Sequence, residues 1–192
     1  MSSSAELLEK ARSLREQGEN KMALEVYRQI IAADNSNLEA LNEMGLVHIL
    51  IGEQMLAINA FDLAISINPN DSRAYGHKAE AYLTLSNFPE ALAAANQGLE
   101  WAPEDPELWA KRARALESVM RIDDAINSYN ESIKFDSENP KTWKALALCL
   151  DAQEKWEEVA RAYRIAGTLH EKRGETKDAE SCFKFAEFAE KS

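Results

Sequence analysis

Apolar side chains recur every three or four residues along this chain, in segments separated by short polar turns. In one such segment Ala23, Tyr27 and Ile30 share one side of an α-helix, because their spacing follows the helical period. No run shows the sustained alternation of a half-buried strand bounded by hairpin turns. The pattern therefore predicts an all-α fold of about 11 helices with no sheet.

The apolar pattern repeats with a period of 34 residues. The second half of each unit opens on an alanine, at Ala23, Ala57, Ala91 and Ala125, and Val159 continues the register. The first half has a large residue, at Leu7, Leu41, Tyr75, Trp109 and Trp143. Four positions further on stands a small residue, at Ala11, Gly45, Ala79, Ala113 and Ala147. Such a fixed period indicates stacked helical hairpins.

The residue types explain why the hairpins stack. The small residues allow the helices to approach closely, and we expect Trp109 and Trp143 to fill the space between neighbouring hairpins. A single hairpin cannot bury its apolar face alone, so its neighbours must supply the rest of the core. If Trp109 is fully buried, truncating it to alanine costs about 3–5 kcal/mol.

These positions resemble the tetratricopeptide repeat, whose unit has a large residue, a small residue, an aromatic, and then alanine, aromatic, alanine and proline. The match runs without a gap from about residue 4 to residue 139. It implies a right-handed superhelical solenoid of antiparallel helix pairs, in one domain over 1–192. The expected repeats are about 4–37, 38–71, 72–105, 106–139 and 140–173, followed by a capping helix at about 175–190.

Turn residues mark the expected helix starts. Ser3 and Ser36 each precede a glutamate by three residues, which is the pattern of a capping box. Asp105 and Asn139 each stand before a proline, which suits a helix that begins at that proline.

The repeat breaks down near the C-terminus. The segment from Val159 to His170 fits both the second helix of repeat five and the first helix of a sixth repeat. We therefore expect a long helix near 156–172 and a last helix near 176–190. Phe185 and Phe188 lie off the apolar stripe of the last helix. They either wrap the edge of the array or form a docking patch.

Charge and cysteine content narrow the class of protein. The formal net charge is −11, and an acidic chain repels nucleic-acid phosphates, so no nucleic acid is expected as partner. Two cysteines in a chain of this length do not form a disulfide framework, which favours a reduced, cytoplasmic protein. No run reaches the ~18 apolar residues of a membrane span, and Met1–Glu6 lacks the features of a secretory signal.

The motifs of common catalytic sites do not occur in the sequence. It has no glycine-rich phosphate loop and no Gly-x-Ser-x-Gly elbow. His48, His77 and His170 lie in different repeats without a partner at metal-ligand spacing. We therefore expect no enzyme activity, no metal and no cofactor.

The resemblance implies that the first helices line a concave groove that holds a peptide. The expected groove residues are Asn42, Leu46, Ile49, Leu50, Arg73, His77, Leu83, Lys111, Arg114, Lys141 and Lys144. Charged positions such as Arg12, Glu39 and Glu43 face the same way. The groove has an apolar stretch in repeats two and three and a basic stretch in repeats four and five. Alternatively, Ile49 and Leu50 pack on the neighbouring repeat, and the basic stretch is solvated surface.

One subfamily binding mode is disfavoured. Co-chaperone members of the resembled family hold a C-terminal carboxylate with Lys, Asn, Asn, Lys and Arg on three consecutive first helices. No triplet of first helices here reproduces that set, and Glu43 or Glu107 would repel a carboxylate.

Three functional hypotheses remain. The first is an adapter that binds a protein segment in the groove, either a peptide or a helix with acidic residues. The second is a structural subunit or assembly factor that docks or self-associates through its C-terminal edge or convex face. The third, RNA binding through Lys111, Arg112, Arg114, Lys141 and Lys144, is disfavoured by the acidity. We expect a monomer or a weak homo-oligomer.

Overall fold

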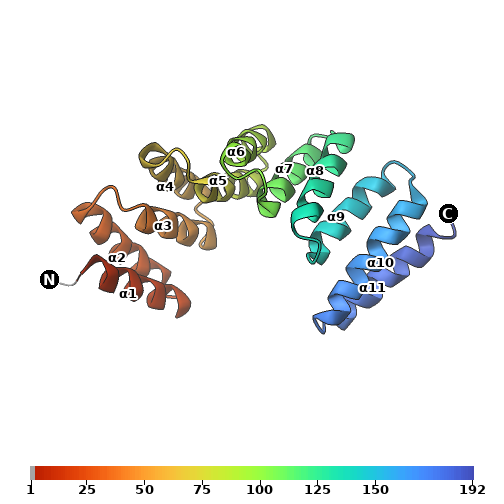
Figure 1. Cartoon of the computed structure of the whole chain (residues 1–192). Coiled ribbons are helices and arrows are strands. Elements are labelled where there is room, and N and C mark those ends of the chain that lie inside the picture. Colours follow the sequence, from red (N-terminus) through yellow and green to blue (C-terminus); the bar gives the residue numbers. More distant parts are fainter. Residues whose placement is uncertain (1–2) are drawn as a thin grey trace. The chain divides into compact units, whose positions relative to one another are not determined.

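The computed structural model describes residues 3–192, which form eleven α-helices joined by short turns (Figure 1). They are α1 (Ser4–Glu16), α2 (Asn20–Ala33), α3 (Leu38–Leu50), α4 (Gln54–Ile67), α5 (Ser72–Thr84), α6 (Phe88–Trp101), α7 (Pro106–Ser118), α8 (Ile122–Phe135), α9 (Pro140–Asp151), α10 (Trp156–Lys172) and α11 (Thr176–Ala189). No strand occurs between residues 3 and 192, so the predicted all-α class is confirmed. Residues 1 and 2, where the expected domain begins, lie outside the described residues.

The chain forms two compact units. Unit 1, Met1–Ala102, contains α1 to α6, and unit 2, Pro103–Ser192, contains α7 to α11. Within each unit, consecutive helices pack against each other, and in unit 1 α3 also contacts α5. The boundary falls within the last few residues of the third expected repeat. The single array over 1–192 stays a prediction.

Two hairpins have a glycine on the first helix that packs against an aromatic ring on the second. A methyl group added at Gly45 would lie 2.5 Å from the ring of Phe61, and one at Gly167 would lie 2.6 Å from Phe183. Both distances are shorter than normal van der Waals contacts, so an alanine at either position would force the ring to shift. Repeat three differs, because Ala79 there packs in a small cluster with Ala95.

The turns inside the hairpins share one backbone conformation. Gly18, Gly52 and Gly174 have positive φ, which glycine adopts without strain. Ser86, Met120 and Glu154 continue the 34-residue register of Gly18 and Gly52 and also have positive φ, although their side chains disfavour it. In this register the turn conformation is therefore kept even where the glycine is missing.

Side-chain caps begin several helices. Ser3 forms the predicted capping box with Glu6. The carboxylate of Asp105 caps α7 and the side-chain amide of Asn139 caps α9, as predicted. The predicted cap at Ser36 is wrong. Asn37 caps α3 by accepting a bond from the amide of Ala40. Ser36 instead donates its hydroxyl proton to Asp34, within the turn that precedes the helix.

The tryptophans of unit 2 are less buried than predicted. Trp109 and Trp143 are both half-buried. Each indole N–H donates to a carbonyl six residues earlier, Pro103 at 2.8 Å and Ser137 at 2.9 Å. These bonds hold the rings over the turns that precede α7 and α9. Truncating Trp109 is therefore expected to cost less than the 3–5 kcal/mol of a fully buried ring.

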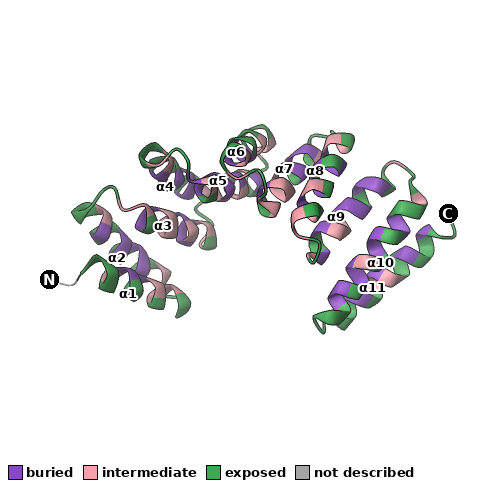
Figure 2. Ribbon diagram, viewed as in Figure 1, coloured by how far each residue is buried: buried purple, intermediate pink, exposed green. Residues whose placement is uncertain are grey.

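The C-terminal helices begin and end close to the predicted limits. α10 spans Trp156–Lys172 and has 17 residues. Tyr163 and His170 are both buried in it, as expected for a helix that fits both the second helix of repeat five and the first helix of a sixth repeat. α11 buries Ala179, Cys182 and Ala186 along one stripe. Figure 2 shows buried stripes facing inward along each helix pair, with exposed residues on the outer turns.

The contact between Gly45 and Phe61 gives a stability prediction. Gly45→Ala places a methyl group against a ring that is fully buried, so the neighbouring side chains must shift. We expect the free energy of unfolding to fall by about 1–3 kcal/mol, measured by urea denaturation.

The matched control uses the pair that repeat three already has. In a Phe61→Ala background the ring is gone, so Gly45→Ala is expected to cost nothing further, as with Ala79 beside Ala95. An equal cost of Gly45→Ala in both backgrounds would show that the contact does not set the packing.

Candidate functional site

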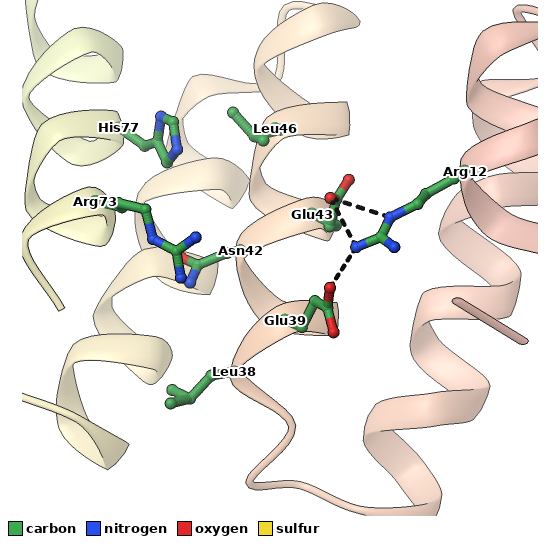
Figure 3. Close-up of a pocket in the computed structure, with 8 residues that line it drawn as sticks. All are labelled: Arg12, Leu38, Glu39, Asn42, Glu43, Leu46, Arg73 and His77. Atoms are coloured by element: carbon green, nitrogen blue, oxygen red, sulfur yellow. Dashed lines mark hydrogen bonds and ion pairs between the residues drawn. The ribbon is translucent and has the colours of Figure 1, made fainter. Parts of the chain in front are cut away.

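A hollow of about 460 Å³ lies among α1, α3 and α5 in unit 1 (Figure 3). α1 contributes one residue, α3 five and α5 two. The lining residues are Arg12, Leu38, Glu39, Asn42, Glu43, Leu46, Arg73 and His77. Four of the residues expected in the groove, Asn42, Leu46, Arg73 and His77, are thus brought together at one place.

An ion-pair network closes the α1 side of the hollow. The Arg12 guanidinium pairs with Glu39 and, at 3.4 Å, with Glu43 (Figure 3). Arg15 pairs with the other oxygen of Glu43. The Tyr27 hydroxyl also lies 3.4 Å from Glu43 and donates to it. Both oxygens of Glu43 are therefore engaged by groups of the chain itself.

The α5 side of the hollow carries the exposed cation. The Arg73 side chain is 81% exposed, and its nearest carboxylate, Asp71, is 3.7 Å away. That carboxylate is also bonded to the Asn42 amide at 2.9 Å and caps α5. Much of the hydrogen-bonding capacity of Arg73 therefore faces solvent. The His77 ring packs against Phe61, with 5.5 Å between ring centroids, and forms the upper wall of the hollow in Figure 3.

The predicted apolar stretch is only partly exposed. Leu46 lines the hollow, and Leu50 at the end of α3 is 61% exposed. Ile49 is half-buried. Leu83 has only 8% of its surface exposed, which corrects its expected place on the groove wall. α5 turns Leu83 into the core, so the exposed apolar surface of unit 1 on this side lies on α3.

The predicted basic stretch lies on α7 and α9 in unit 2, and part of its charge is neutralised. Lys111 has only 14% of its side chain exposed and bonds Glu107 at 3.2 Å. Lys144 lies 3.9 Å from Asp178 of α11. Arg114 and Lys141 are exposed. The stretch therefore offers less free positive charge than four cations imply.

Arg112, the fifth residue of the RNA hypothesis, is directed inward. Its guanidinium donates to the Ser128 hydroxyl and lies over the Trp109 ring, 5.5 Å from the ring centroid. Burial lowers the pKa of Arg112. Because this side chain joins α7 to α8, it contributes to packing within the hairpin.

The two C-terminal phenylalanines remain exposed. Phe185 and Phe188 are 53% and 68% exposed on α11, and the Phe185 ring stacks on Tyr163 with 5.2 Å between centroids. Both rings thus present apolar surface to solvent at the last helix of unit 2.

Sequence reasoning missed the pairing that shapes the hollow. Arg12 and Glu39 were expected to face the groove separately, and Leu38 was not expected there. The signal was present as opposite charges on adjacent first helices, 27 and 31 residues apart, which is two helical turns and one helical turn short of the 34-residue period. The sequence alone does not show whether such a charge binds a partner or pairs within the chain, because that depends on where each side chain points.

Other site types find little support in residues 3–192. No group of three His, Cys, Asp or Glu side chains in this range is placed to hold a metal ion. No helix in the same range is both long and apolar enough to cross a membrane.

Comparison with known sequences decides the family. Sequence profiles described as tetratricopeptide repeat match residues 8–72 and 56–115, which together span more than half of the chain. The chain belongs to the tetratricopeptide repeat (TPR) family. Members of this family are generally interaction modules that bind protein partners. A search of curated proteins found no match.

Solved structures share the TPR fold at low sequence identity. MamA residues 41 to the end, from Desulfovibrio magneticus, is 19% identical with a TM-score of 0.74, over 89% of this chain and 96% of that chain. TTC0263 of Thermus thermophilus, a thermophilic TPR protein, is 17% identical with a TM-score of 0.74, over 97% and 100%. YrrB, described as a TPR protein with an unusual peptide-binding site, is 16% identical with a TM-score of 0.69, over 91% and 90%. At these identities the likeness shows the fold alone.

The Tyr27–Glu43 contact makes stability depend on alkaline pH. Burial, and secondly the charge of Glu43, raises the pKa of Tyr27 from 10.0 to about 12. Between these values the folded chain keeps the phenol proton while the unfolded chain loses it, so the free energy of unfolding falls as pH rises. Urea denaturation at several pH values is expected to give a shallower fall for Tyr27→Phe. Identical slopes for the two proteins would contradict this account.

Proposed function

We propose that this TPR protein is a non-catalytic adapter that holds a segment of a partner protein on the first helices of its hairpins. The observation that carries the proposal is the hollow among α1, α3 and α5, which joins apolar surface to an exposed guanidinium. A concave site with a mostly fixed wall and a few oriented polar groups is typical of a binding site.

The hollow supports a partner that combines apolar and acidic side chains. Leu46, and Leu50 beyond the hollow, offer apolar surface on α3. Arg73 has five N–H donors and only a distant carboxylate partner, so it favours a carboxylate that binds through both oxygens. Glu43 is occupied by Arg12 and Arg15, which removes the repulsion that an unpaired carboxylate would exert.

Unit 2 offers a separate candidate contact region. Arg114 and Lys141 are exposed, and Lys111 and Lys144 lie beside carboxylates of the chain. We propose that the hollow of unit 1 supplies apolar contacts and that the cations of unit 2 can add a salt-dependent electrostatic contribution. The residues proposed for binding are Asn42, Leu46, Ile49, Leu50, Arg73 and His77 in unit 1, and Lys111, Arg114, Lys141 and Lys144 in unit 2.

The adapter function is tested by pull-down from cells of the native source, with the bound chains identified by mass spectrometry. Leu46→Asp/Leu50→Asp is expected to reduce recovery of the partner about tenfold or more, because two apolar contacts of roughly 1.5 kcal/mol each are replaced by charge. Lys144→Glu alone is expected to have a small effect that disappears at high salt.

The matched control for this experiment is Met55→Asp/Leu63→Asp. It puts the same charge on two exposed apolar residues of α4, which do not line the hollow. Equal recovery with wild type and the α3 variant, both folded by circular dichroism, would overturn the groove proposal. An equal loss of partner recovery in the α4 control variant would also overturn the groove proposal.

The second candidate is a structural subunit that self-associates or docks through α11. The exposure of both Phe185 and Phe188, with Phe185 held in place by Tyr163, favours it. Two exposed aromatic rings on one helix are a common feature of protein contacts.

Light scattering of the purified chain distinguishes the two candidates. Self-association predicts a mass that rises with concentration and returns to the monomer value in Phe185→Ser/Phe188→Ser. A strict monomer that retains its partners in that variant would contradict the second candidate and leave the adapter.

A cytoplasmic location is part of the proposal. Cys149 and Cys182 are both free and buried, and burial raises the pKa of the Cys149 thiol to about 12. Such thiols are small apolar side chains in a core and need no oxidising compartment. Fractionation of source cells with antibody detection tests the location.

A further inference from the structure

The two glutamates that line the hollow of unit 1 are held very differently. Glu43 has 18% of its side chain exposed, and its carboxylate is shared by Arg12, Arg15 and Tyr27. Glu39 has 57% of its side chain exposed, and Arg12 is its one side-chain partner in the part of the chain that the structure describes (Figure 3). Glu43 is therefore fixed by three neighbours, whereas Glu39 is held by a single contact at the surface.

The fold does not require the pair between Arg12 and Glu39. Ion pairs between exposed side chains contribute little to stability, because water solvates both charges when they separate. Glu39 also stands in the first turn of α3, where a carboxylate interacts favourably with the helix dipole whether or not it contacts Arg12. Separating the two side chains therefore leaves the hairpins intact.

Glu39 is nevertheless the main partner of the Arg12 guanidinium. The pKa of Arg12 is raised, and the hydrogen bond to Glu39 is the largest cause. The contact with Glu43 is long, at 3.4 Å, and that carboxylate also binds Arg15. A carboxylate from outside the chain that binds Arg12 must therefore take the place of Glu39.

The charges that line the hollow sum to zero. Two guanidiniums balance two carboxylates, with histidine counted as neutral: Arg12, Arg73, Glu39 and Glu43. A neutral lining does not by itself attract a charged segment. Without the Glu39 carboxylate the lining would carry one net positive charge, and Arg12 would be open to a ligand. The charge that the hollow presents to a partner thus depends on Glu39.

We propose that Glu39 sets the charge selectivity of the hollow, by acting as an internal competitor for Arg12. A partner carboxylate binds the exposed Arg73 directly, but it reaches Arg12 only by displacing Glu39. Glu39 therefore lowers the affinity for segments rich in acidic residues and leaves the apolar contact with Leu46 unchanged. This inference rests on the proposed binding of a partner segment in the hollow.

Fluorescence anisotropy with a labelled peptide tests the competition. The probe is an eight-residue peptide of alternating leucine and glutamate, titrated with the full chain, and a second peptide carries glutamine in place of glutamate. Glu39→Gln is expected to tighten binding of the glutamate peptide about three- to tenfold at low salt, because Arg12 becomes available for a charge-assisted pair. The gain is expected to shrink as salt is raised. The glutamine peptide is expected to bind wild type and Glu39→Gln equally.

Two further variants assign the effect to the pair. Glu90→Gln makes the same change in net charge in the first turn of α6, outside the lining of the hollow, and is expected to bind both peptides as wild type does. Arg12→Gln removes the contested cation. In that background Glu39→Gln is expected to change the affinity for the glutamate peptide by less than about twofold, because the two residues act as one coupled pair. Circular dichroism and urea denaturation check that each variant is folded.

Several results would overturn the competition. Equal affinity of the glutamate peptide for wild type and Glu39→Gln, or no saturable binding to either, shows that Glu39 does not limit the access of a carboxylate. Weaker binding by Glu39→Gln shows that Glu39 contacts the segment directly. An equal gain with the glutamine peptide, or in Glu90→Gln, removes the role of the pair. An undiminished gain in the Arg12→Gln background shows that Arg12 is not the contested group.

The adapter function and the competition fail separately. The adapter is tested by recovery of the native partner with Leu46→Asp/Leu50→Asp, which leaves Glu39 in place. Loss of the partner from that variant, together with equal peptide affinities of wild type and Glu39→Gln, keeps the adapter and refutes the competition. A gain in peptide affinity in Glu39→Gln, without any native partner in the pull-down, refutes the adapter and keeps the competition.

Discussion

The contact between a glycine on the first helix and an aromatic ring on the second is the constraint that sets the packing of two hairpins. Where the ring is Phe61 or Phe183, glycine leaves room for it, whereas a methyl group would lie about 2.5 Å from the ring and force a shift. This contact fixes how closely two helices approach and therefore which residues of each helix face inward. Once the inward faces are fixed at a 34-residue period, the remaining positions are free to differ from hairpin to hairpin, and the binding surfaces arise at those positions.

The same constraint explains why the charges of unit 1 are shared between helices. α3 contacts both α2 and α5, and its outer side faces α1 closely enough for Arg12 and Arg15 to reach Glu43. These pairs link hairpin one to hairpin two while leaving Arg73 on α5 with only a distant carboxylate partner. The charges of unit 1 thus divide into those that join neighbouring helices and one guanidinium that is largely exposed. In unit 2, Lys111 and Lys144 likewise lie beside carboxylates of the chain.

Features that follow the period were predictable from the sequence, and features that depend on one side chain's direction were not. The helices, the Gly45 and Ala79 positions, the long α10 and the cap at Asp105 all follow from spacing and residue type. The cap at Asn37 was missed because Ser36 and Asn37 are both good caps, and the direction of the preceding turn decides between them. Leu83 was assigned to the groove because position alone does not show that α5 rotates it into the core. Contacts between helices decide both the capping residue of α3 and the direction of the Leu83 side chain.

Unit 2 differs from unit 1 because α10 belongs to two registers at once. A helix that closes hairpin five and opens hairpin six must bury residues on two sides. Ala160 and Leu169, nine residues apart and therefore on opposite sides of α10, are accordingly both buried, together with Tyr163 between them around the helix. The regular hairpins of unit 1 instead leave a hollow among neighbouring first helices. A helix shared by two registers thus keeps fewer positions for contacts outside the fold than a helix that serves one hairpin alone.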